Sequence, residues 1–192
     1  METPILRDQT PAEYFKELVD AALVRQRVQA GDLTTYYLVN LLCQFVRLEG
    51  TPDADQPLAI RLARALQSGG LEQRSRLRHL GDFSLFVTGF FADSLNRRSV
   101  DVDYYVSMGE YAYGSLGRSE AEAFGEVFAE LATRFVGFAD VLAEVSDRST
   151  LRSSSDVLRL YEKWLRTGSS RDRDKLIERG IVPNASLKLR IQ

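Results

Sequence analysis

Apolar residues recur at helical spacing along most of the chain, and helix start and stop signals divide them into segments. The clearest start is Thr10-Pro11-Ala12-Glu13, which has the form of a capping box with proline at the first helical position. The pattern predicts seven to eight helices, over about residues 11–31, 35–48, 57–69, 71–95, 101–114, 120–146, 153–168 and 171–179. It therefore predicts an all-α protein.

Two of these segments differ from ordinary amphipathic helices. Residues 35–48 are apolar on most sides, which predicts that this helix is the buried centre of the bundle. In residues 120–146, large apolar side chains alternate spacings of four and three: Phe124, Phe128, Leu131, Phe135, Phe138, Leu142 and Val145. The spacing predicts one long helix with an aromatic seam, about 39 Å at 1.5 Å per residue. We expect the seam to be core, in preference to a coiled-coil interface.

The chain reads as a single domain. No repeat of 20 to 50 residues and no low-complexity linker divides the 192 residues. We expect one helical domain over 1–192, in which residues 1–9 form a flexible N-terminus and residues 183–192 an extended C-terminal tail. The expected architecture is a bundle of about seven to eight helices.

Composition limits the possible partners and the compartment. Hydrophobic residues make up 44% and charged residues 27%, with a net charge of −2, so nothing in the overall charge points to nucleic acid or an anionic membrane. Arg74, Arg76 and Arg78 read as a solvated helix face. The single cysteine, Cys43, excludes an internal disulfide and a multi-cysteine zinc site, and its apolar neighbours predict a buried free thiol. Without a signal pattern or a long apolar run, we expect a cytoplasmic protein.

Residues 77–113 hold the least ordinary chemistry of the chain, including its only histidine, His79. Gly81, Gly89 and Gly109 lie inside predicted helices, where each glycine costs roughly 1 kcal/mol relative to alanine. We expect them to mark a close contact between helix 71–95 and the helix that follows it. In the alternative, they open a cavity for a ligand.

His79 and Asp82 are the candidate chemical pair, because they lie one helical turn apart. In one reading the carboxylate orients the imidazole for acid–base catalysis. In the favoured reading Asp82 is a structural acceptor, since a carboxylate among apolar residues is usually paired when buried. The candidate partners are Tyr104, Tyr105, Tyr111, Tyr113, Arg76 and Arg98. A single histidine excludes a two-histidine metal site, so no metal is predicted, and no sequence pattern identifies a cofactor or a set of catalytic residues.

Three segments carry a resemblance to known sequences: HLGDFSLFVTGFF, VDYYVSMGEYAY and LYEKWLRTG. They resemble a family of bacterial, all-helical cytosolic proteins with no assigned function, over about residues 36–183. The resemblance implies a bacterial, cytosolic origin and carries over no activity or functional residue.

These observations leave three functional hypotheses. The first is a non-catalytic helical protein that binds a protein partner or associates with itself, a homodimer included, without nucleic acid or membrane. The second is a binder of a small apolar or planar ligand, haem included, with candidate ligand-binding residues His79, Asp82, Phe86, Tyr104, Tyr105 and Met108. The third is an enzyme that uses His79 and Asp82 in proton transfer. Of the three hypotheses, an enzyme is the one that the sequence supports least.

Overall fold

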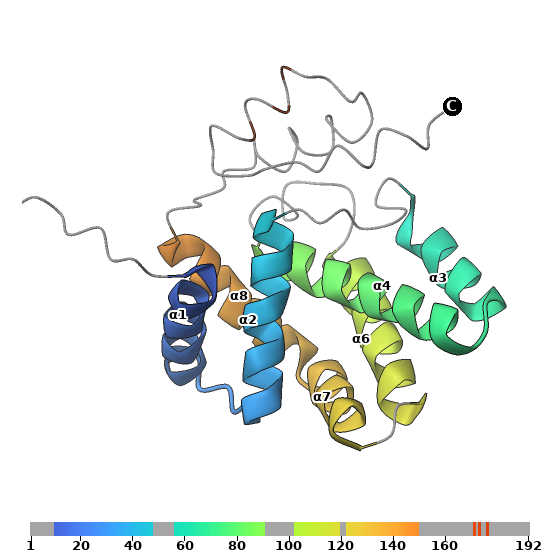
Figure 1. The fold of residues 1–192 in the computed structure, drawn as a ribbon, viewed down its shortest axis with the longest axis horizontal. Helices are drawn as coiled ribbons and strands as arrows, with labels where there is room; N and C mark the ends of the chain where they lie inside the picture. The colour runs from blue at the N-terminus through green and yellow to red at the C-terminus, as the bar shows by residue number, and fades with distance from the viewer. Residues whose placement is uncertain are drawn as a thin grey trace, which may run out of the picture.

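The computed structural model describes residues 10–47, 56–90, 102–119 and 122–149, together with Arg171, Arg173 and Leu176. All regular secondary structure in these residues is helical, which confirms the all-α fold class. The helices, shown in Figure 1, are α1 (Pro11–Gln26), α2 (Asp32–Arg47), α3 (Leu58–Gln67), α4 (Gly70–Phe90), α6 (Val102–Ser119), α7 (Glu122–Thr133) and α8 (Phe135–Arg148). Predicted helix 153–168, both predicted terminal segments and most of 171–179 lie outside the described residues.

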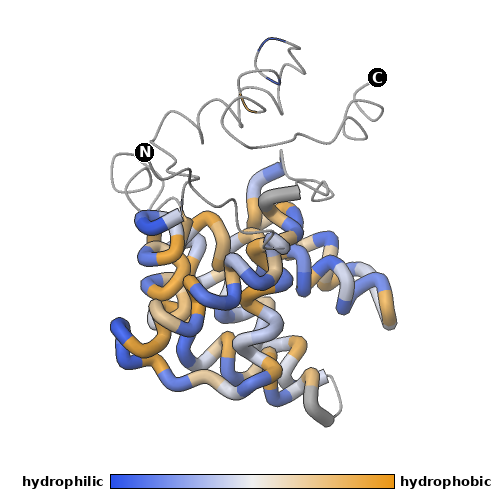
Figure 2. The backbone as a smooth tube through the Cα atoms, turned by 60° about the vertical axis from the view of Figure 1, so that its left-hand side comes forward, coloured by the Kyte–Doolittle hydropathy of each residue, from blue (hydrophilic) through white to orange (hydrophobic). Residues whose placement is uncertain are grey.

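Helix α4, and not α2, is the centre of the bundle. It packs against α3, α6, α8 and α2, while α1 packs against α2 and α8, and α7 against α6. From Leu80 to Phe90 every residue of α4 except Phe83 is buried. The prediction of a central α2 was wrong because α2 keeps an exposed side, on which Tyr36 is 66% exposed. Figure 2 shows apolar and polar residues alternating along the helices, as expected where each helix buries one side.

The predicted start of α1 is confirmed, but its end is not. Thr10 and Glu13 form the capping box: Oγ1 of Thr10 accepts from the Glu13 N–H, and the Glu13 carboxylate accepts from the Thr10 N–H at 2.8 Å. The helix ends at Gln26 because Arg27 takes a left-handed conformation, with φ at 54°. The predicted range to residue 31 is therefore too long, and Gly31 lies in the turn to α2.

A carboxylate from α7 fixes that turn. The Gly31 N–H and the Thr34 hydroxyl both donate to Oε2 of Glu130, at 3.2 and 2.5 Å. Helix α2 therefore begins at Asp32, earlier than the start predicted at about residue 35. The start of α2 is set by a residue almost one hundred positions away, which no local pattern could indicate.

The predicted long helix is two helices. The chain turns at Arg134, where φ is −116° and ψ is 27°, so α7 ends at Thr133 and α8 begins at Phe135. Most of the aromatic seam is core, as expected, including Phe135 at 1% exposure, but Phe124 is 62% exposed. The turn lets the two halves pack on different partners: α7 mainly on α6, and α8 on α4 and α1.

Helices α6 and α3 also differ from what their sequences predict. The sequence pattern predicted that this helix ends at about residue 114, but α6 passes through Gly114 and Gly117 and ends at Ser119. A Cβ at Gly117 would lie 2.9 Å from the backbone nitrogen of Ala129, so this glycine permits close approach of α6 to α7. In α3, burial does not follow hydrophobicity throughout, since Leu66 is 48% exposed while Arg61 is buried.

Candidate functional site

Asp82 is buried in the interior and is bonded by two tyrosines. It is 5% exposed, and its Oδ1 accepts from the hydroxyl of Tyr37 in α2 at 2.6 Å and from the hydroxyl of Tyr113 in α6 at 2.8 Å. Nε of Arg78 lies 3.7 Å from Oδ2 of Asp82 and donates to the Tyr37 hydroxyl at 3.1 Å. We call these four residues the Asp82 cluster; they tie α2 and α6 to α4.

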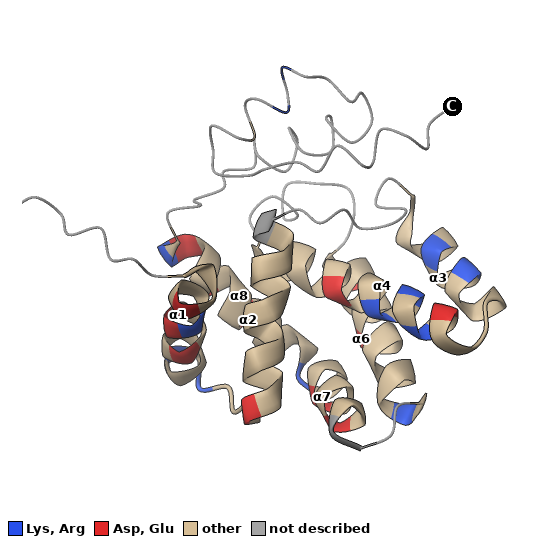
Figure 3. Ribbon diagram, in the orientation of Figure 1, with Lys and Arg blue, Asp and Glu red and all other residues tan. Residues whose placement is uncertain are grey.

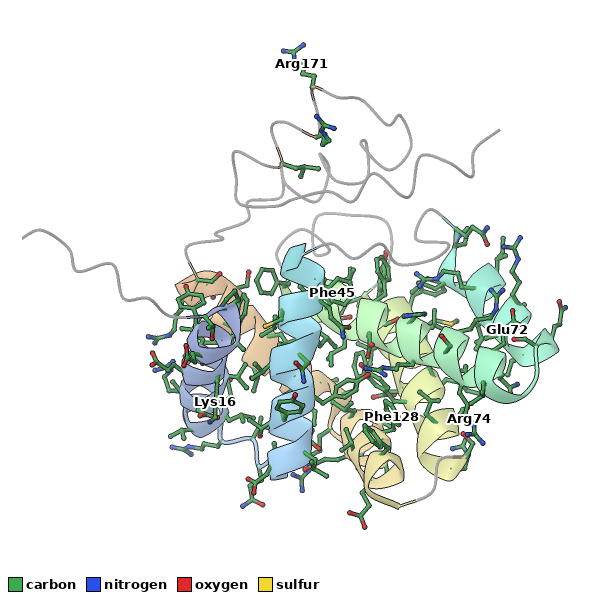
Figure 4. All side chains as sticks on the ribbon, in the orientation of Figure 1. Lys16, Phe45, Glu72, Arg74, Phe128 and Arg171 are labelled. Atoms are coloured by element: carbon green, nitrogen blue, oxygen red, sulfur yellow. The ribbon has the colours of Figure 1, made fainter. Side chains whose placement is uncertain are left out.

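Aromatic rings and a guanidinium enclose this cluster. Phe128 of α7, labelled in Figure 4, meets the Tyr37 ring edge-on at 5.6 Å between centroids and stacks on the Tyr113 ring at 5.9 Å. The Arg78 guanidinium covers the outer side of Tyr37, 5.3 Å from the ring centroid. The space beside Asp82 is thus occupied by side chains of the chain itself.

The cluster has the electrostatics of a buried structural acceptor. Burial raises the pKa of Asp82 to about 6, against the lowering effect of the tyrosine hydrogen bonds and of Arg78. Burial also raises the pKa of Tyr37 and of Tyr113, and the charge on Asp82 raises both further. Both hydroxyls therefore remain protonated donors at neutral pH. Burial disfavours the charged form of Arg78 and so lowers its pKa. The nearby Tyr37 and Asp82 raise that pKa by more, so the pKa of Arg78 is higher than its ordinary value.

His79 lies outside the Asp82 cluster. None of the hydrogen bonds that Asp82 makes within the described residues involves the imidazole. Burial lowers the pKa of His79, and the positive charges of Arg78 and Arg61 lower it further, so the ring is neutral at pH 7. A carboxylate partner would raise that pKa. The geometry therefore supports Asp82 as a structural acceptor and gives no support to an acid–base pair.

The remaining candidate residues lie in separate places. Phe86 is sandwiched between Phe45 and Phe90, at centroid distances of 4.1 and 4.9 Å. The Tyr104 hydroxyl accepts from the Ala59 N–H at 2.8 Å, at the start of α3, and its ring meets Tyr105 edge-on. Met108 is partly buried against the core. The structure brings Tyr104 and Tyr105 together, but not with the Asp82 cluster.

The three interior glycines mark helix contacts that are already filled. A Cβ at Gly81 would lie 2.7 Å from the Tyr113 ring, and one at Gly109 would overlap the Phe135 ring. The predicted close contact between α4 and α6 is thus present at Gly81 and also at Gly109, where a Cβ would lie 3.0 Å from Cβ of Ser84 in α4. Gly89 instead faces α8, where a Cβ would lie 2.6 Å from Cβ of Leu142. The ligand cavity that these glycines suggested is occupied by the ring of Tyr113, the ring of Phe135 and the side chain of Leu142.

Sequence reasoning identified Asp82 and one partner, Tyr113, but missed Tyr37 and Arg78, and it predicted Phe128 only as part of the aromatic core seam. Arg98, another proposed partner, lies outside the described residues. Tyr37 sits in an apolar run of α2, and the nearest acidic residue, Asp32, is five positions away, so no local signal pairs this tyrosine with a carboxylate. Arg78 did have a local signal, because it lies four residues before Asp82 on the same helix face.

The comparisons add no relative. No protein-family model, curated protein or solved structure matches this chain. The resemblance to a bacterial helical family therefore stays a prediction. Within the described helices, no group of three potential ligands is placed to hold a metal ion. Across the same part of the chain, no helix is both long and apolar enough to cross a membrane.

Proposed function

We propose that this chain is a non-catalytic helical protein that acts by binding protein, either another protein or a second copy of itself. The observation that carries the proposal is the exposed side of α2. We define the α2 face as Leu33, Tyr36, Asn40 and Gln44, which follow one another along this helix at helical spacing; Asn40 is half-buried and the other three are exposed. Tyr36 is 66% and Leu33 is 55% exposed, and no residue of α2 from Leu33 to Val46 is charged.

An uncharged exposed stripe of this length is unusual for a helix that faces only water. Charged residues are depleted at the centres of protein–protein interfaces, where tyrosine is enriched. Most surface helices of globular proteins carry charged residues on the side away from the core. The α2 face has the composition of an interface centre, and its amide side chains supply both donors and acceptors.

The Asp82 cluster gives this face a rigid base. Tyr37 lies next to Tyr36 on α2 and is bonded to Asp82 and Arg78 of α4. Ordered contacts below the surface lower the entropic cost of binding at the surface. Protein binding is also favoured over the other two hypotheses because the residues proposed for ligand or proton chemistry lie in separate places, where other side chains of the chain bond to them or pack against them.

The test is a photoreactive benzophenone amino acid in place of Tyr36, in the full chain, irradiated in the cells that make the protein. The matched control carries the same residue in place of Tyr111, a tyrosine of α6 that is 46% exposed and belongs to a different helix. We expect discrete protein adducts at position 36 and few at position 111. Equal, diffuse labelling at the two positions would refute the proposal. Native mass spectrometry of the purified protein would show a bound small molecule if the ligand hypothesis were correct.

A further inference from the structure

The chain changes direction at a single residue between α7 and α8, and Figure 3 shows the ribbon turning at this junction. Thr133 is the last residue of α7 and Phe135 the first of α8, so only Arg134 leaves the helical conformation. The Arg134 N–H still donates to the Glu130 carbonyl, and the Arg134 carbonyl accepts from the Phe138 N–H, both at 3.0 Å. Both bonds have the spacing of an α-helix. We call Arg134 the hinge.

The sequence on both sides of the hinge fits a continuous helix. No proline lies between Glu122 and Arg148, and the apolar seam keeps its alternation of four and three residues across Arg134. Arginine is itself a good helix former. A straight helix over residues 122–148 would be about 40 Å long. The local sequence therefore does not impose the change of direction at the hinge.

Contacts with the turn between α1 and α2 hold the hinge in place. The Arg134 guanidinium donates to the carbonyl oxygen of Gln29 and to the carboxylate of Glu130. Gly137, in the first turn of α8, lets the same turn approach closely, because a Cβ at Gly137 would lie 3.3 Å from Cγ2 of Val28. Gln29 and Val28 lie about one hundred positions before the hinge, so these contacts are tertiary. The hinge can straighten once they are lost.

Straightening the hinge would uncover α8. Helix α7 packs mainly on α6, whereas α8 packs on α4 and α1, so one straight helix cannot keep both sets of contacts within a single chain. The side chains of α8 that would lose their cover are apolar and at most 1% exposed: Phe135, Phe138, Leu142 and Val145. Their exposure to water is unfavourable. The surface that fits them is the site that α8 itself occupies, and a second copy opened in the same way offers that site.

We propose that two copies of this chain exchange α8 through a straightened hinge, so that each α8 packs on α4 and α1 of the other copy. The exchange gives a closed two-fold dimer, because each copy gives and receives the same helix. The contacts of α8 with α4 and α1 are recreated between the two chains. A connection as short as one residue favours this outcome, since short hinges promote domain swapping. The exchange goes beyond the proposed function and rests on α8 and the hinge, not on the α2 face.

Refolding from urea at two protein concentrations tests whether the dimer forms. The full chain is refolded at about 5 µM and at about 500 µM and analysed by size-exclusion chromatography with light scattering. We expect one species of 21.7 kDa at the low concentration and, at the high one, a second species of twice that mass. The dimer should dissociate only slowly after dilution, because α8 must leave a filled site before it can return to its own chain.

Variants of the hinge test its role. Arg134→Ala removes the donor to Gln29 and introduces the best helix former, so it should raise the dimer fraction at least about threefold. Insertion of Gly-Ser-Gly after Arg134 should lower that fraction at least about threefold, because it breaks the continuous helix and lets α8 fold back. Arg118→Ala, at an exposed arginine in the last turn of α6, is the matched control and should leave the fraction unchanged. A circular dichroism melt of each variant confirms folding.

Isotope mixing shows whether α8 is the element exchanged. Arg25 of α1 contacts Glu144 of α8, so Arg25→Lys places an amine where a carbodiimide can join it to that carboxylate as an amide. Labelled and unlabelled chains of this variant are unfolded and refolded together in equal amounts. In the dimer, about half of these cross-links should join a labelled chain to an unlabelled one. The cross-link of Lys16 to Asp20, within α1, should never mix isotopes and serves as the control.

Three results would overturn the inference. The first is the absence of a dimer for both wild type and Arg134→Ala after refolding at about 500 µM. The second is a dimer in which every cross-link between positions 25 and 144 carries a single isotope, because such a dimer forms through another surface. The third is an equal dimer fraction for wild type and Arg134→Ala, which would mean that the hinge does not control association. None of them depends on whether the insertion variant folds.

Discussion

Replacing Asp82 with asparagine isolates the free energy that the buried carboxylate contributes. Asparagine keeps an oxygen that can accept from the hydroxyls of Tyr37 and Tyr113, but it does not titrate. Asp82 has a pKa of about 6 in the folded chain, against 3.8 as its ordinary value. A group whose folded pKa is raised stabilises the fold fully below its unfolded pKa, and this contribution is lost as the pH rises through the folded pKa.

The size of the effect follows from the two pKa values. Ionised Asp82 disfavours the folded state by about 3 kcal/mol relative to the protonated form, at about 1.4 kcal/mol for each pKa unit. Roughly 1 to 2 kcal/mol of this develops between pH 5 and pH 8. Across that range the wild type should therefore lose stability relative to Asp82→Asn by this amount.

The assay is urea unfolding of both proteins at intervals from pH 5 to pH 8, followed by circular dichroism. The quantity of interest is the difference between their free energies of unfolding. Burial also lowers the pKa of His79, but His79 is present in both proteins and its contribution largely cancels in the difference. A difference that is flat with pH, or that favours the wild type increasingly as pH rises, would refute the reasoning. A flat difference would mean that the tyrosines and Arg78 balance the cost of burying Asp82, and a rising preference for the wild type would mean that they outweigh it.

Three further changes probe the packing around this cluster. Tyr113→Phe keeps the ring on Phe128 but removes one donor to Asp82, so it should cost about 1–3 kcal/mol, more at pH 8 than at pH 5, measured by urea unfolding. Gly89→Ala would set a Cβ 2.8 Å from the backbone oxygen of Ala139 and should lower the melting temperature, whereas Gly69→Ala, with open space around it, should not. Phe135→Ala removes a ring that is 1% exposed and should cost about 3–5 kcal/mol in the same unfolding assay; a loss below about 1 kcal/mol would mean that the ring is not core.

The sequence by itself determined the fold class and most helix positions. Helical periodicity and local punctuation act within a few residues, as in the capping box of Thr10 and Glu13, so they can be read directly from the chain. The sequence also indicated that Asp82 would need a donor, because a carboxylate with apolar neighbours is costly to bury alone. Phe128 and Phe135 were correctly predicted to be core, because the spacing of the aromatic seam is a local pattern.

Tertiary structure decided what depends on contacts between distant residues. The seam from Phe124 to Val145 fits one helix as well as two, and only packing against α4 and α6 makes the turn at Arg134 favourable. Tyr37 reached Asp82 across 45 positions, and Glu130 fixed the start of α2 across 96. The exposed side of α2 could not be predicted either, since its apolar residues surround most of the helix and the sequence does not say which side the other helices leave uncovered. Burial is a property of the assembled bundle, whereas periodicity is a property of each helix alone.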